Sequence, residues 1–193
     1  MLNKFLIIYD SQLINYLEKE KIPATLFVSG RWIEKNADTL KKLVSNPLFE
    51  IENHGLNHKA CSVNQRGAYH DTGTSSAEEI VDEVEGNARR IQVLTGYKPK
   101  FYRPATCYCD EVGVEIVEAL GYKVISFSVL GDAGATYSKD KVKKALLNTP
   151  SGSIIIFHMN HPEGETAEGI MEATPLLRKK GFRFVKLSDY KLK

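Results

Sequence analysis

Two histidines separated by three residues are the first candidates for chemistry in this sequence. His54 and His58 (HGLNH) follow the short run from Phe49 to Ile51, which has the composition of a β-strand. At this spacing a tight loop or the first turn of a helix would direct both imidazoles toward one ion, and imidazole nitrogen is a common zinc ligand. The spacing also fits two surface histidines in a loop, so it leaves both interpretations open.

An arginine and a third histidine follow two other predicted strands. Arg103, held by Pro104, comes after residues 100–102 and could orient a carboxylate by a bidentate contact, with a surface salt bridge as the alternative. His158 follows the apolar run 154–157, which is typical of a strand buried on both faces. His158 should therefore emerge at the mouth of the fold, with a satisfied core histidine as the alternative.

The elements that must position these side chains alternate along the chain. After about residue 10, β-rich runs alternate with amphipathic segments, a pattern typical of strand-helix units around a parallel sheet. The predicted strands are 24–28, 49–51, 100–102, 122–127, 153–157 and 182–185, and the predicted helices are 10–21, 31–45, 77–94, 110–120, 139–147 and 167–180. The sequence therefore predicts the α/β class.

A distorted or incomplete (β/α) barrel of about seven strands is favoured over an open sheet, counting one further strand before Asp10. The polar clusters 53–58, 103–106, 130–135 and 158–161 all follow predicted strands directly. In a barrel the carboxyl ends of the strands meet at one face, where catalytic side chains from several strands converge. The polar segment 59–76 is longer than most connections and is expected to flank this site.

The composition fits one domain over residues 1–193 and excludes some kinds of partner. The 26 basic and 24 acidic residues are interleaved along the predicted helices and give a formal net charge of +2, which disfavours nucleic acid. The apolar run from Phe5 to Tyr9 is far shorter than the ~20 residues of a membrane span, and no signal-peptide cleavage site follows it. The three cysteines match neither a zinc ribbon nor a redox Cys-x-x-Cys motif.

The order of these motifs resembles the polysaccharide deacetylases of the NodB-homology type. An HxxxH motif, an Arg-Pro pair, an aspartate and a histidine after an apolar strand follow one another along the chain in this family. The resemblance runs from about Tyr9 to the end and includes the strand segment 22–28. It implies a hydrolase that uses a divalent metal, with zinc as the expected ion, to remove N-acetyl groups from an amino-sugar polymer or oligosaccharide.

The resemblance assigns His54 and His58 to the metal and three further residues to catalysis. Arg103 would orient the catalytic base, and Asp132, in the segment Val129-Leu130-Gly131-Asp132, would tune or orient the acid. His158 would be the acid that protonates the leaving amine.

Two details of this assignment concern neighbouring residues. His161 lies on the loop after His158, so it is not expected to be the acid. The turn Pro104-Ala105-Thr106 would contact the substrate. Many family members have a tyrosine in this turn whose backbone N–H helps to bind the oxyanion, and Ala105 can make the same contact because a backbone N–H does not depend on the side chain.

The family has an aspartate motif at its start, and this sequence does not contain that motif in its usual form. Members begin with a strand that ends in a Thr-Phe-Asp-Asp or Thr-Phe-Asp-Ala sequence, followed by a loop. Either Asp10 is a substitute acid, or the motif lies upstream of Met1; the second is favoured because Tyr9-Asp10 leads straight into the predicted helix. The 193-residue chain is then expected to have little deacetylase activity, and a version extended upstream is expected to be active.

Two other functions fit the same motifs. A relative that has lost the catalytic base could serve as a sugar-binding or regulatory module, and a related barrel could hydrolyse a small amide or cyclic imide. The segment 59–76 distinguishes the substrates, because an open groove fits a polymer and a loop folded over the metal fits a small molecule.

Overall fold

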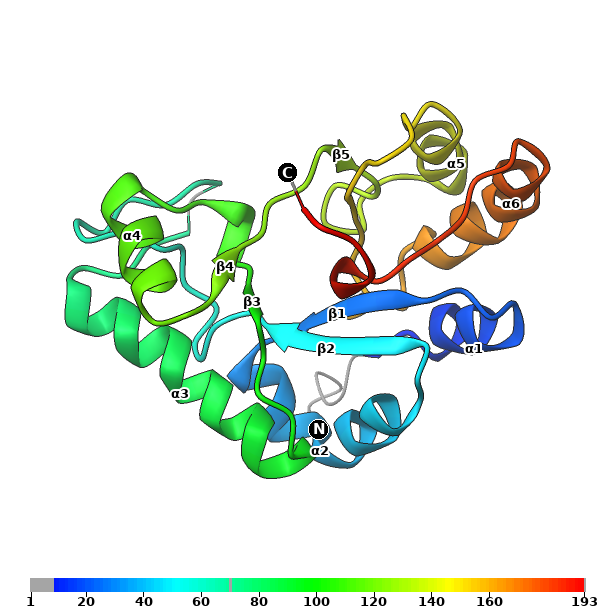
Figure 1. Ribbon diagram of the computed structural model, residues 1–193. Coiled ribbons are helices and arrows are strands. Elements are labelled where there is room, and N and C mark those ends of the chain that lie inside the picture. Colours follow the sequence, from blue (N-terminus) through cyan, green and yellow to red (C-terminus); the bar gives the residue numbers. More distant parts are fainter. Residues whose placement is uncertain (1–8, 70, 193) are drawn as a thin grey trace, which may run out of the picture. The chain divides into compact units, whose positions relative to one another are not determined.

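The computed structural model describes residues 9–69 and 71–192, which fall into two compact units (Figure 1). The central unit comprises Thr25–Ser126, and the terminal unit comprises the chain up to Ala24 together with the chain from Phe127 onward. Each unit has its own strands and its own helices.

A four-stranded sheet in the order β1-β2-β3-β4 forms the core of the central unit. Its strands are β1 (Ala24–Val28), β2 (Phe49–Asn53), β3 (Phe101–Tyr102) and β4 (Lys123–Val124). β2 pairs in parallel with β3 at Asn53 and Tyr102, and β3 pairs in parallel with β4. All five residues of β2 are buried, so its two glutamates need polar partners inside the protein.

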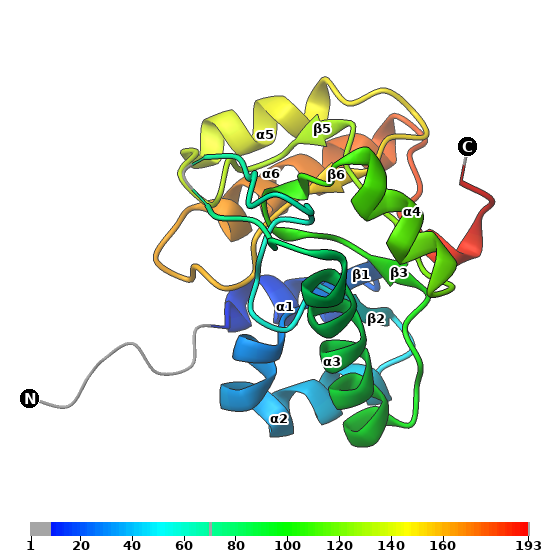
Figure 2. The same cartoon turned by 90° about the vertical axis from the view of Figure 1, so that its left-hand side faces the viewer.

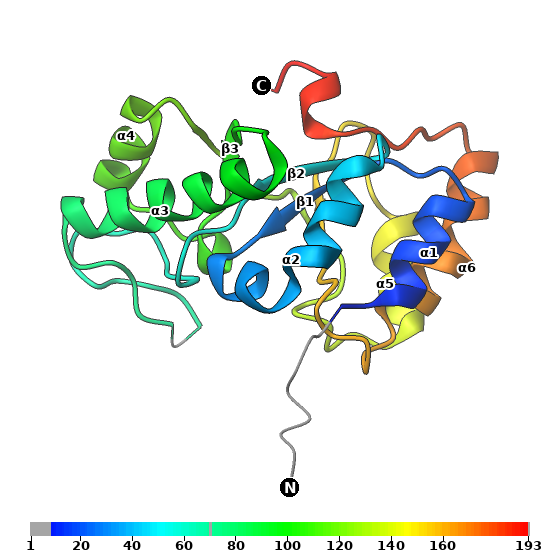
Figure 3. The same cartoon turned by 90° about the horizontal axis from the view of Figure 1, so that it is seen from below.

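Three α-helices and one 3-10 helix complete the central unit: α2 (Gly30–Ser45), α3 (Ala77–Thr95), η1 (Ala105–Cys107) and α4 (Glu111–Ala119). Figure 3 shows α2 and α3 side by side. α3 begins where the Ser76 hydroxyl accepts the Glu79 N–H, and it ends at Gly96, whose φ of +72° favours glycine. Its buried face carries Ile80, Val84, Ala88 and Ile91, together with the polar residues Glu83 and Asn87.

The terminal unit is built on a two-stranded parallel sheet, in which β5 (Val129–Leu130) pairs with β6 (Ile155–Ile156). Its helices are α1 (Ser11–Lys19), α5 (Lys139–Leu147), α6 (Thr166–Lys179) and the 3-10 helix η2 (Leu187–Asp189). α5 and α6 pack against each other (Figure 2). A Cβ at Gly169 would lie 2.4 Å from the Cβ of Val142, so glycine is what allows the two helices to approach this closely.

Most predicted helices and strands are present in the described residues. The strand Ala24–Val28 and the helix Lys139–Leu147 have the predicted bounds. The other α-helices differ from their predicted bounds by a few residues at their ends. The predicted first strand lies outside the described residues except for Tyr9. None of the described helices is long and apolar enough to cross a bilayer.

One strand prediction in the last third of the chain was wrong, and one strand there was missed. Residues 182–185 are not a strand, although their sequence is β-rich. A strand needs a hydrogen-bonded neighbour, and no strand of the described residues pairs with this segment. Conversely, Leu130 was placed in the polar cluster 130–135 and Val129 in no predicted strand, but the two residues form β5 because β6 supplies the pairing partner.

Glu52 on β2 shows how the central sheet accommodates a buried carboxyl group. It is fully buried and accepts hydrogen bonds from the N–H groups of Lys100 (2.8 Å) and Phe101 (2.7 Å) and from the Tyr97 hydroxyl (2.7 Å). Burial raises the pKa of Glu52 to about 7, despite these hydrogen bonds, which lower it. The stability that this group contributes is therefore fully present below its ordinary pKa of 4.5 and is lost as the pH rises through 7.

Replacing Glu52 with glutamine is expected to reduce the pH dependence of stability. Between about pH 5 and about pH 8, ionisation of Glu52 should lower the free energy of unfolding by up to about 3 kcal/mol in the wild type. Glutamine keeps an acceptor oxygen but has no proton to lose. Urea unfolding at both pH values measures the difference, with the exposed Glu34→Gln as the matched control. An unchanged pH dependence in Glu52→Gln would contradict the assignment.

Candidate active site

The two histidines of the HxxxH motif lie together at the end of β2. Their ring centroids are 4.6 Å apart and the rings are nearly perpendicular, at 86°. His54 Nδ1 lies 2.6 Å from the main-chain carbonyl oxygen of Arg103. A carbonyl oxygen can only accept, so Nδ1 carries the hydrogen and Nε2 keeps the lone pair that a metal would use.

Arg103 contacts its neighbours in the central unit through both its main-chain carbonyl and its side chain. Its carbonyl fixes the His54 ring, and its guanidinium donates to the carbonyl oxygens of Ile125 (3.4 Å) and Ser126 (3.1 Å) just beyond β4. The guanidinium also lies over the Phe27 ring, 4.2 Å from its centroid, and burial lowers its pKa. The sequence predicted a carboxylate partner, whereas the partners seen in the described residues are carbonyls and an aromatic ring.

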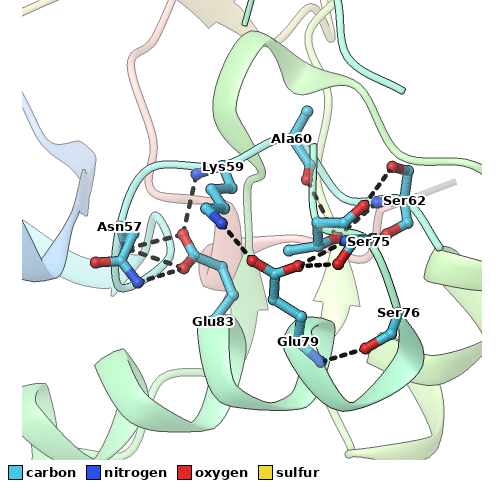
Figure 4. A network of polar contacts seen from close by, with 9 residues as sticks. Asn57, Lys59, Ala60, Ser62, Ser75, Ser76, Glu79 and Glu83 are labelled. Atoms are coloured by element: carbon cyan, nitrogen blue, oxygen red, sulfur yellow. Dashed lines mark hydrogen bonds and ion pairs between the residues drawn. The ribbon is translucent and has the colours of Figure 1, made fainter. Parts of the chain in front are cut away.

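A buried carboxylate on α3 fixes the loop between the two histidines (Figure 4). Glu83 accepts the Asn57 N–H with both oxygens, at 2.9 Å, and accepts the Lys59 N–H at 3.0 Å and the Asn57 side-chain amide at 3.2 Å. A Cβ at Gly55, where φ is +79°, would lie 2.5 Å from Glu83 Oε1. Figure 4 also shows the neighbouring Lys59–Glu79 ion pair. Glu83 was missed from the sequence, although a glutamate inside the apolar stripe of α3 was a usable signal.

The terminal unit contains a second histidine whose ring is held by a hydrogen bond, His158. Asp132 is fully buried after β5, and His158 follows β6. Asp132 Oδ1 lies 2.8 Å from His158 Nδ1, and Oδ2 accepts the His158 N–H at 2.7 Å and the Thr166 hydroxyl at 3.1 Å. The same carboxylate therefore fixes both the main chain and the ring of His158. Thr166, at the start of α6, carried no recognisable signal in the sequence.

The electrostatics of this pair determine which ring nitrogen of His158 is available. Burial alone would raise the pKa of Asp132, but the hydrogen bonds from His158 and Thr166 outweigh burial and lower the pKa. The ionised carboxylate only accepts, so the hydrogen of the His158 ring sits on Nδ1 and Nε2 is the atom that can exchange a proton. The His158 side chain is 34% exposed, which leaves room for that exchange.

The remaining predicted residues have other partners. Asp10 is the N-cap of α1: its Oδ1 accepts the Leu13 N–H at 2.9 Å, and its own N–H donates to the carbonyl oxygen of Met159. His161 lies 2.8 Å from Glu163 and makes a separate surface pair. In the Pro104-Ala105-Thr106 turn, the Ala105 N–H donates to the Lys59 carbonyl at 3.2 Å. The loop that carries the histidines and this turn are thus bonded to each other.

The part of the chain that the structure describes does not contain a complete set of metal ligands. No group of three or more His, Cys, Asp or Glu side chains there is arranged to hold an ion. The two imidazoles of His54 and His58 are suitable donors for two positions of a zinc ion.

Comparison with known proteins identifies the family. The sequence model described as polysaccharide deacetylase matches residues 8–125, which is more than half of the chain. The chain belongs to the polysaccharide deacetylase family. The α/β fold class predicted from the sequence, of the NodB type, is confirmed by solved structures of the same family, which are similar in fold.

Three relatives illustrate the range of this family. The peptidoglycan-N-acetylmuramic acid deacetylase PdaA of Bacillus subtilis is 24% identical in an alignment of 189 residues that covers 94% of this chain and 65% of PdaA. The peptidoglycan-N-acetylglucosamine deacetylase of Bacillus cereus is 23% identical in an alignment of 185 residues that covers 94% of this chain and 81% of that protein. The structure of a CE4 family pseudoenzyme from Bacillus anthracis has a TM-score of 0.77 at 21% identity, covering 92% of this chain and 58% of that one. The deacetylase-family chain thus spans less than two thirds of PdaA.

Changing Glu83 to glutamine is expected to weaken zinc binding at the site that the sequence predicts for His54 and His58. Glutamine cannot accept the N–H groups of Asn57 and Lys59 with two oxygens, so the loop between the histidines loses part of its support. A decrease of about tenfold in zinc affinity is expected, by analogy with other residues that hold a ligand loop in place. Titration calorimetry with zinc measures it. The adjacent, exposed Asp82→Asn is the matched control, and equal affinities in the two variants would contradict the role of Glu83.

Proposed function

We propose that the site residues of this chain serve the metal-dependent hydrolysis of N-acetyl groups on an amino-sugar polymer, with little turnover in the 193 residues by themselves. Family membership supports hydrolase chemistry of this class. The relatives named as peptidoglycan deacetylases of N-acetylmuramic acid and N-acetylglucosamine support an N-acetylated polysaccharide or oligosaccharide as the substrate. The observation that carries the proposal is the fixed orientation of His54 and His158, each of which has Nδ1 held by an oxygen acceptor.

His54 and His58 would hold the divalent metal, with zinc as the expected ion. Neutral imidazole nitrogen suits zinc, and the carbonyl of Arg103 selects the tautomer of His54 that has Nε2 available. When bound, zinc would supply Lewis-acid polarisation of the acetyl carbonyl and would lower the pKa of a water molecule. Glu83 and Arg103 would keep the two rings in place without touching the substrate.

His158 would serve as the general acid. In its protonated form it gives the Nε2 proton to the amine nitrogen as the carbon–nitrogen bond breaks. The ionised carboxylate of Asp132 holds Nδ1–H and stabilises the imidazolium that exists before this transfer, so Asp132 acts through His158. Thr166 and the His158 N–H keep the Asp132 carboxylate in one orientation.

Asp10 and the turn Pro104-Ala105-Thr106 are the candidates for the catalytic base and for the contacts to the sugar. Asp10 is the candidate substitute acid, but one of its carboxylate oxygens already caps α1. Arg103 would contribute by fixing the ends of β3 and β4, next to the turn Pro104-Ala105-Thr106 that is proposed to contact the substrate. The Ala105 N–H would have to leave the Lys59 carbonyl to reach a substrate oxygen.

The experiment measures zinc content and acetate release from N-acetylglucosamine oligomers, for the chain and for a version extended upstream. His54→Ala/His58→Ala should lose zinc, and equal zinc content in this variant and the wild type would refute the metal site. His158→Ala should lower the rate of acetate release by ~10²–10⁴-fold, since this is the usual contribution of a general acid. His161→Ala, the matched control, should leave the rate unchanged. Loss of acetate release in His161→Ala but not in His158→Ala would reverse the assignment.

A further inference from the structure

Two cysteines that are far apart in the sequence lie side by side in the central unit. Cys61 belongs to the segment 59–76, and Cys109 precedes α4. The two residues form a parallel β-bridge, in which the Cys61 N–H donates to the Tyr108 carbonyl and the Asp110 N–H donates to the Cys61 carbonyl, both at 2.9 Å. Paired residues of parallel strands direct their side chains to the same face, so the two thiols point the same way.

The sulfur atoms meet over a glycine of α4. A Cβ at Gly113 would lie 2.6 Å from the sulfur of Cys61 and 3.1 Å from the sulfur of Cys109, so both sulfur atoms occupy the space that a side chain at this position would need. Neighbouring strands lie about 4.8 Å apart, within the ~4.4–6.8 Å over which two Cα atoms can be joined by a disulfide.

We propose that Cys61 and Cys109 are a modification site, at which an intrachain disulfide forms when the protein meets a peroxide. The thiolate of Cys109 attacks one peroxide oxygen, takes up that oxygen as a sulfenic acid, and releases water after protonation. The sulfur of Cys61 then attacks the sulfur of Cys109, the S–O bond breaks, and a second water leaves. In sum two thiols and one hydrogen peroxide give one disulfide and two molecules of water.

The two cysteines differ in a way that fits this order of events. Cys61 is only 1% exposed and packs in the core cluster with Tyr102 and Val117, whereas Cys109 lies at the edge of the same cluster and is partly exposed. The hydrogen bond to Cys109 and burial raise the pKa of the Cys61 thiol. A dissolved oxidant therefore meets Cys109 first, and Cys61 is positioned to resolve the product.

The third cysteine is a less suitable partner. Cys107 belongs to η1, in which Thr106 and Cys107 both have positive φ values, so the chain turns between Pro104 and Tyr108. Burial raises the pKa of the Cys107 thiol, and the charge of Arg103 acts in the opposite direction. Cys109, by contrast, has its sulfur toward Cys61 and Gly113. The disulfide should therefore join Cys61 to Cys109 and leave Cys107 reduced.

A disulfide here would tie the segment 59–76 to the start of α4. Hydrogen bonds already join the two, since the Val63 N–H donates to Asp110 Oδ2 and the Asp110 N–H donates to Cys61. The bond would add no new contact in the folded state but would restrict the unfolded chain between residues 61 and 109. The oxidised protein should therefore unfold at a higher temperature than the reduced protein, whatever the enzymatic activity of the chain.

The test is peroxide treatment of the full 193-residue chain, followed by thiol counting in denaturant and peptide mapping without reductant. The expected result is a fall from three free thiols to one, a linked peptide that contains Cys61 and Cys109, and full recovery of thiols with dithiothreitol. The mapping uses the wild-type chain, so poor folding of a variant cannot hide the outcome. A link between Cys107 and Cys109, or three thiols that persist while added dithiothreitol is oxidised, would overturn the proposal.

Single-cysteine variants show which of the three cysteines form the disulfide. Cys107→Ser should still form the disulfide and should still show the rise in unfolding temperature on oxidation. Cys109→Ser should keep Cys61 reduced under the same treatment and should show no rise. Disulfide formation that requires Cys107, or a rise in unfolding temperature that persists in Cys109→Ser, would count against the site.

Discussion

A hydrogen bond from a histidine Nδ1–H to an oxygen that can only accept is the interaction on which the candidate residues of each unit depend. In the central unit the oxygen is the main-chain carbonyl of Arg103, and in the terminal unit it is the carboxylate of Asp132. The two acceptors have different consequences. A neutral carbonyl favours a neutral ring that offers Nε2 to a metal, whereas a carboxylate also stabilises the charged ring that an acid must become before it gives up its proton.

Buried carboxylates are the means by which the fold holds these rings in place. Burying an unpaired carboxylate would be very costly, so each one must collect several donors. Glu83 does so with the main-chain N–H and side-chain amide of Asn57, between His54 and His58, and with the N–H of Lys59 directly after His58. Asp132 does so with the N–H and ring of His158 and the hydroxyl of Thr166. The donors that compensate for burial are the same groups that position the histidines, so stability and site geometry rest on the same bonds.

The sequence predicted the features that depend on local pattern. Helices such as α3 follow from apolar residues at three- and four-residue spacing, and β1 follows from a run of β-formers after Pro23. The motif residues were found because each follows a strand. Features that depend on a distant partner were not predictable. Residues 182–185 have strand composition but lack a partner among the described strands, whereas Val129 and Leu130 form a strand because β6 pairs with them. The contacts of Glu83 with the loop, and of Cys61 with Cys109, join segments that no periodicity connects.

The measurement that tests the central claim most directly is the tautomeric state of the histidines, read from nitrogen-15 NMR of the metal-free protein with labelled imidazole rings. The hydrogen bonds of His54 and His158 predict that both neutral rings carry hydrogen on Nδ1, with the Nε2 resonance in the range of an unprotonated ring nitrogen. His158 should lose this preference in Asp132→Asn, whereas His54 should keep it. Hydrogen on Nε2 of either ring in the wild-type protein would contradict the account, because the nitrogen assigned to the metal or to proton transfer would then not have the lone pair that the role requires.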